Sequence, residues 1–116
     1  MGSTGVLYRS GQIMTEILAD SVQPSPLSRT VGFNGALNAF IKCISGVYPI
    51  TLTLETAVGF GGQRITIFQA GTGTVTLKFF EKETCNGATS KVLSNLNQCL
   101  TLESDGANWL IVGTAG

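Results

Sequence analysis

Apolar and polar residues alternate over much of the chain after residue 39, a pattern typical of half-buried β-strands. The alternation is clearest at residues 48–55, YPITLTLE, where isoleucine or leucine occupies every second position from residue 50. Further strands are expected at residues 39–44, 64–69 and 74–80, each bounded by glycine-rich or polar breaks. The pattern therefore predicts a β domain over residues 39–116.

A β-hairpin is the last predicted element, over residues 98–113. Two alternating apolar segments flank the polar stretch at residues 104–108. That stretch contains Asp105-Gly106, and glycine supplies the positive φ that a tight turn requires. Six residues in alternating strands are expected to form the domain core or a trimer interface: Leu52, Leu77, Leu100, Leu102, Trp109 and Ile111.

Residues 1–38 have a different pattern, with short apolar clusters and breaks at Pro24 and Pro26. Residues 15–22 are compatible with two helical turns. The large apolar side chains are untypical of disorder, so this segment is expected to be an extended N-terminal arm that lies across the β domain or a neighbouring subunit. Eight residues are expected to make the contacts of this arm: Val6, Leu7, Tyr8, Ile13, Met14, Ile17, Leu18 and Phe33.

Together these patterns predict an all-β fold, a small antiparallel β-sandwich or barrel-like domain with an extended arm. Threonine–leucine pairs recur 25 residues apart, at residues 51–52, 76–77 and 101–102. Three dissimilar units are too few for a solenoid. The recurrence is therefore interpreted as the strand spacing of an antiparallel meander or small sandwich.

Composition adds an expectation of assembly. Only 12% of the 116 residues are charged, 43% are hydrophobic, and the formal net charge is zero. Globular domains typically contain about 25% charged residues, so this chain is expected to hide surface in an assembly. No positive field exists to bind nucleic acid, and no apolar run reaches the roughly 18 residues of a membrane span. The N-terminus also lacks the basic start of a signal peptide.

The residues offer little chemistry. Histidine is absent, which removes the commonest general base and the usual metal ligand. We therefore expect no enzymatic activity, cofactor, metal or small-molecule substrate. Trp109 fits packing better than stacking on a sugar ring. The chain has three cysteines, Cys43, Cys85 and Cys99, which allow one disulfide, either within the chain or between chains.

The C-terminal hairpin also carries a family resemblance. The ending LTLESDGANWLIVG resembles the terminal β module of many tailed-phage virion proteins. In that module an apolar strand, a Ser-Asp-Gly-x-Asn turn and a Trp-Leu-Ile-Val strand close a small trimeric β domain. The preceding RITIFQAGTGTVTL is similar to the strand–turn–strand units of those modules. The resemblance covers about residues 48–113.

The resemblance implies a homotrimeric structural protein of a bacteriophage virion, in one of two roles. The first is a capsid decoration, or cement, protein that is made in the host cytoplasm and then stabilises the phage head by bridging major capsid protein subunits on the capsid surface. The alternative is the receptor-binding or tip module of a tail fibre or spike. The length of the chain and its apolar arm favour the first role. A third expectation is a β-sandwich carbohydrate-binding module.

Overall fold

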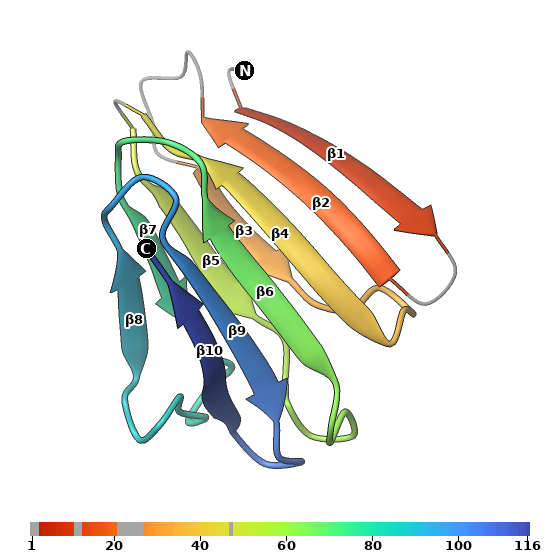
Figure 1. Cartoon of the computed structure of the whole chain (residues 1–116). Helices are drawn as coiled ribbons and strands as arrows, with labels where there is room; N and C mark the ends of the chain where they lie inside the picture. The colour runs from red at the N-terminus through yellow and green to blue at the C-terminus, as the bar shows by residue number, and fades with distance from the viewer. Residues whose placement is uncertain (1–2, 11–12, 21–26, 47) are drawn as a thin grey trace.

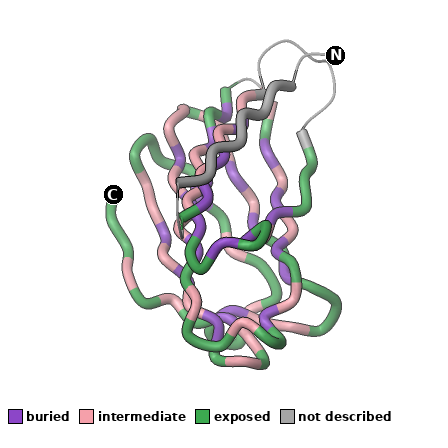
Figure 2. Tube along the Cα trace, turned by 90° about the vertical axis from the view of Figure 1, so that its right-hand side faces the viewer, coloured by how far each residue is buried: buried purple, intermediate pink, exposed green. Residues whose placement is uncertain are grey.

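The computed structural model describes residues 3–10, 13–20, 27–46 and 48–116 (Figure 1). These residues form β-strands and no helix, in two sheets packed face to face (Figures 1 and 2). The prediction of an all-β fold is confirmed, and of the two expected forms, sandwich and barrel-like, the structure has the sandwich. The six-stranded sheet contains, in spatial order, β1 (Ser3–Ser10), β2 (Ile13–Asp20), β4 (Asn38–Ile44), β6 (Arg64–Gln69), β9 (Cys99–Ser104) and β10 (Trp109–Ala115). The four-stranded sheet contains β3 (Leu27–Val31), β5 (Ile50–Leu54), β7 (Val75–Lys78) and β8 (Ser90–Leu93).

From β2 to β7 the chain alternates between the two sheets. β2, β4 and β6 pair in parallel in one sheet, and β3, β5 and β7 pair in parallel in the other. The chain therefore winds as a short coil whose turns stack side by side, and β8, β9 and β10 close the coil with antiparallel pairs. The sheets are thus mixed, whereas the alternating pattern had led us to expect antiparallel neighbours.

The turn between β6 and β7 shows why the pairing is parallel. Its Ala70 N–H donates to the carbonyl of Cys43 at 2.7 Å, and its Gly73 N–H donates to the carbonyl of Ser45 at 3.0 Å. Both acceptors belong to the preceding turn of the coil. The backbone of Ser45 occupies the place that a Cβ at Gly71 would need, so glycine allows the two turns to stack. The chain then crosses to the other sheet instead of folding back on β6.

The 25-residue recurrence follows from this coil. Thr51 lies beside Thr76 in parallel register, and Leu52 lies beside Leu77, so two of the three repeats are neighbours in β5 and β7. Of the two arrangements expected for these pairs, the antiparallel meander is wrong, and the pairs lie in a small sandwich. The third repeat, at residues 101–102, lies in the other sheet and is antiparallel to β6. For the first two repeats, the spacing is the length of one turn of the coil.

The predicted closing hairpin is confirmed. β9 and β10 are antiparallel, and the Asp105 N–H donates to the carbonyl of Asn108 at 3.0 Å. The Asp105 carboxylate accepts the N–H groups of Asn108 and Ala107 at 2.7 and 2.9 Å. These two bonds hold the pKa of Asp105 below its ordinary value. Gly106 has a φ of 92°, a left-handed conformation that favours glycine.

The N-terminal segment contributes strands to both sheets. β1, β2 and β3 all lie within residues 1–38, the expected arm. β2 covers most of residues 15–22, and the expectation of helical turns there is wrong, because pairing with β4 along the strand outweighs a weak helical preference. Residues 21–26, which include both prolines of this segment, lie outside the described residues.

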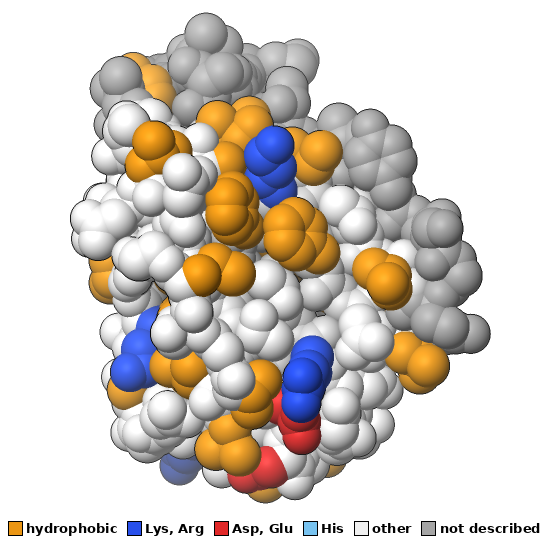
Figure 3. Space-filling model, viewed as in Figure 1, with side chains coloured by type: hydrophobic (Ala, Val, Ile, Leu, Met, Phe, Trp, Pro, Cys, Tyr) orange, Lys and Arg blue, Asp and Glu red, His pale blue; other side chains and the backbone are white. Residues whose placement is uncertain are grey.

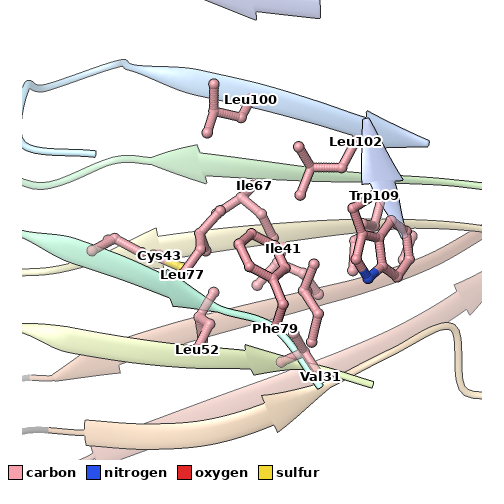
Figure 4. Close-up of a cluster of buried hydrophobic side chains, with 14 of the residues drawn as sticks. Val31, Ile41, Cys43, Leu52, Ile67, Leu77, Phe79, Leu100, Leu102 and Trp109 are labelled. Atoms are coloured by element: carbon pink, nitrogen blue, oxygen red, sulfur yellow. The ribbon is translucent and has the colours of Figure 1, made fainter. Parts of the chain in front are cut away.

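The core fills the space between the sheets, and buried positions alternate with more exposed ones along the strands (Figure 2). Side chains from both sheets meet there (Figure 4). Figure 4 labels ten members of this core: Val31, Ile41, Cys43, Leu52, Ile67, Leu77, Phe79, Leu100, Leu102 and Trp109.

Candidate functional site

The residues predicted for the core or a trimer interface lie in the core of the single chain. Five of them are buried there: Leu52, Leu77, Leu100, Leu102 and Trp109. Ile111 is partly buried against the same cluster. Because one chain alone buries them, a contact between copies would have to use other side chains.

The residues predicted for the capsid-contact arm do not lie together on one surface. Three are buried in the core: Met14, Leu18 and Phe33. Ile13 and Ile17, by contrast, are outward-facing positions of β2, the first 51% exposed and the second half-buried. The other three have side chains outside the part of the chain whose side chains are described: Val6, Leu7 and Tyr8. Side chains buried in the core cannot anchor this chain to another protein.

The outer face of the six-stranded sheet carries a set of apolar side chains that we call the apolar face. Its members occupy the outward positions of β2, β4, β6 and β10: Ile13, Ile17, Phe40, Ile44, Phe68 and Leu110. The rings of Phe40 and Phe68 stack with 6.3 Å between centroids. Figure 3 shows this side of the molecule, with orange side chains spread across its middle. Exposed apolar side chains gathered on one sheet face are typical of an interaction site.

Few charges interrupt the apolar face. Lys42 is an outward position of β4, and Arg64 pairs with Glu103 at 2.8 Å. The hydroxyls of Thr66 and Thr101 lie 3.0 Å apart and hydrogen-bond each other. Each of these two pairs makes one hydrogen bond within the chain, which lowers the cost of covering the face with another protein.

The outer face of the four-stranded sheet has different chemistry. Its outward positions form rows across the parallel strands, in the registers Ser28–Thr51–Thr76 and Thr30–Thr53–Lys78. We call these six residues the hydroxyl face. Val92 at the β8 edge is the large apolar residue in these rows. Hydroxyl groups remain bonded to water at little cost, so this face is suited to solvent.

A cleft of about 300 Å³ lies where β2 faces β3. The buried Glu16 carboxylate forms an ion pair there with Arg29. Glu55 also lines this cleft, with its carboxylate where a Cβ at Gly32 would lie. Glu16 and Arg29 occupy inward positions of β2 and β3. The residues beside them in the next turn of the coil are apolar, Ile41 beside Glu16 and Leu52 beside Arg29. Inward-pointing charges of this kind protect a sheet edge from pairing with other chains.

A second hollow, shallow and largely open to solvent, lies at the end of the sandwich where the β5–β6, β7–β8 and β9–β10 connections meet, with a volume of about 340 Å³. We call it the loop-end groove. Eight residues line it: Thr56, Val58, Phe80, Glu81, Lys82, Glu83, Ala107 and Asn108. Val58 and Phe80 are exposed, at 58% and 40%. The groove therefore combines apolar surface with carboxylate, ammonium and amide groups.

The three cysteines are free thiols in the described structure. Burial raises the pKa of Cys43 to about 12, with a smaller contribution from the charge of Glu16. Burial also raises the pKa of Cys85 and of Cys99. Cys85 is buried. Cys99 is half-buried and lies opposite Phe68 on the outer face of the six-stranded sheet.

Within the described ranges, no three His, Cys, Asp or Glu side chains are grouped so that they could hold a metal ion. A search of the same ranges finds no helix with the length and apolar character of a membrane span.

Sequence patterning did not identify the apolar face or the loop-end groove. The apolar face could have been found from Phe40, Ile44 and Phe68, which alternate with the buried residues of their strands and therefore point to the opposite side of the sheet. The signal for the second was weaker, because the groove joins three connections that are distant in the sequence.

Comparison with protein-family models and with curated proteins finds no match to this chain.

Proposed function

We propose that this chain is a homo-oligomeric structural module of a bacteriophage virion, and that its copies associate through the apolar face. The observation that carries the proposal is the apolar face itself, in a chain of zero net charge with only 12% charged residues. The resemblance of residues 48–113 to virion β modules supports the setting, and the two-sheet coil is compatible with it.

The size of the apolar face fits a contact between copies. The five strands from β2 to β10, about 4.8 Å apart and each about 20 Å long, give a sheet surface of roughly 500 Å², of which the apolar face is a part. One side of a standard protein interface is of the same order, at about 800 Å². Full burial of one Leu, Ile or Phe side chain contributes about 1.5–3 kcal/mol. The summed free energy of burying several such side chains is therefore comparable to the free-energy cost of association, about 4–15 kcal/mol.

The tip module of a tail fibre or spike is the role that the geometry supports better. The preference for capsid decoration depended on an apolar N-terminal arm that would contact other subunits. Three side chains of that segment, Met14, Leu18 and Phe33, are instead buried in the core. The turns of the coil stack along one direction, and the antiparallel hairpin of β9 and β10 ends the stack. A stack that is closed in this way suits the end of an elongated assembly. Capsid decoration is the competing proposal, in which the apolar face would lie against the major capsid protein.

Immunogold electron microscopy tests the role directly. Antibodies raised against the recombinant chain would be applied to virus particles recovered from the organism that encodes it. The tip proposal expects gold at the far end of the tail or of its fibres. Gold spread evenly over the head would support capsid decoration instead, and particles without label would contradict both roles.

A further inference from the structure

We propose that the loop-end groove is a binding site for neutral carbohydrate. It lies at one end of the sandwich, so ligand binding there is separate from self-association through the apolar face and the two can fail independently. The inference goes beyond the structural role, and it assigns a ligand class to residues that the proposed function does not use.

The groove is held in shape before any ligand binds. The Glu83 carboxylate accepts the hydroxyl of Thr56 and, at 2.8 Å, the N–H of Ala57, which joins the β7–β8 connection to the β5–β6 connection. The Thr84 N–H donates to the Asn108 side-chain oxygen at 2.9 Å, which joins the same connection to the β9–β10 turn. A site that is already ordered loses less entropy when a ligand binds.

The apolar side of the groove can receive the flat apolar face of a sugar ring. Phe80 is 40% exposed, although Phe79 beside it is buried in the core. Val58 and Ala107 lie on the same groove and are exposed. An aromatic ring that keeps exposed surface beside polar groups is suited to a ligand with both apolar and hydrogen-bonding faces.

The polar side of the groove supplies donors and acceptors for sugar hydroxyls. Among the described residues, the carboxylate of Glu81, the ammonium of Lys82 and the amide nitrogen of Asn108 have no hydrogen bond within the chain. Glu83 uses its carboxylate to fix the loops. With two carboxylates and one ammonium, the groove has a net negative charge. A neutral sugar is therefore favoured over an anionic one.

Saturation-transfer difference NMR tests this site, with maltose, cellobiose, lactose and chitobiose as neutral probes and sialyllactose as the anionic probe. At least one neutral disaccharide should receive saturation from the protein, with a dissociation constant on the order of millimolar. Phe80→Ala should weaken binding by about tenfold or more, the effect expected for a central aromatic contact. Leu96→Ala, which removes a similarly exposed apolar side chain at the opposite end of the sandwich, should leave binding unchanged.

Glu81→Gln provides a second variant with almost no change in shape, and it should also weaken binding. Circular dichroism and thermal unfolding would establish that each variant is folded. Absence of transfer to every neutral probe would overturn the proposal. It would equally be overturned by binding that both Phe80→Ala and Glu81→Gln leave intact, or by a preference for sialyllactose over the neutral sugars.

Discussion

The two sheets share one core but present opposite chemistry to their surroundings. The six-stranded sheet exposes the apolar face, centred on the stacked rings of Phe40 and Phe68. The four-stranded sheet exposes rows of hydroxyl groups, such as Thr51 beside Thr76. Both faces are built from alternating strands of similar length. We propose that the difference reflects different surroundings, with protein against the apolar face and water against the hydroxyl face.

The largest effect is expected from damage to the core that both faces share. Trp109→Ala should lower the free energy of unfolding by about 3–5 kcal/mol, because it opens a cavity beside Phe33. Trp109→Phe should cost less, since the Trp109 Nε1 is buried without a hydrogen-bond partner among the described residues. Chemical denaturation of both variants measures the difference. Equal stability of Trp109→Ala and the wild type would show that Trp109 is not a core residue.

The second-largest effect is expected on self-association, and it should distinguish the apolar face from the hydroxyl face. Phe40→Ser with Phe68→Ser should weaken self-association by about 100-fold or more, because both stacked rings leave the centre of the proposed interface. Sedimentation velocity across a dilution series measures the shift. The matched pair on the other face, Thr51→Ser with Thr76→Ser, should associate like the wild type. Equal behaviour of the two double variants would remove the distinction between the faces.

Cysteine reactivity gives a smaller and independent signal. Cys99 lies opposite Phe68 and should be protected from alkylation while the copies are associated. Dilution, or the double substitution at Phe40 and Phe68, should speed its reaction several-fold. Cys43 should stay unreactive throughout, because burial raises its pKa to about 12 and the thiolate is the reacting form. Mass spectrometry of alkylated peptides measures both rates, and a Cys99 rate independent of concentration would contradict coverage of this face.

The smallest effect is expected on the hydroxyl face. Thr53→Ser removes only a methyl group from a partly exposed strand position and keeps the hydroxyl. Stability should change by no more than about 0.5 kcal/mol, the usual range for surface substitutions. Thermal unfolding checks this value, and a change in oligomeric mass would mean that the hydroxyl face also contacts protein.

The strands and the closing hairpin were predictable because their signals are local. Alternation located β4 to β7, and Asp105-Gly106 located the last turn. Parallel pairing was not predictable in the same way. It depends on hydrogen bonds between turns of the coil, such as Ala70 to Cys43, and on the close approach of Gly71 to Ser45. These contacts join residues about one coil turn apart, and no local pattern records them.

The candidate sites were harder to predict than the fold. Met14, Leu18 and Phe33 were assigned to an arm because prolines and glycines surround them, and the structure buries all three. Sequence identifies such side chains as apolar but not what covers them. The apolar face was overlooked because Phe40 and Phe68 are apolar residues in the outward phase of their strands, which alternation alone assigns to solvent.

The mass of the wild-type chain in solution tests the central claim most directly. Native mass spectrometry or sedimentation equilibrium at micromolar concentration should give a multiple of the 12.1 kDa chain mass, and a trimer would give three times that value. The same measurement on the double Phe40→Ser, Phe68→Ser variant should give 12.1 kDa. A wild-type mass of 12.1 kDa at all concentrations would contradict the account, because the apolar face would then have no copy of the chain to cover it.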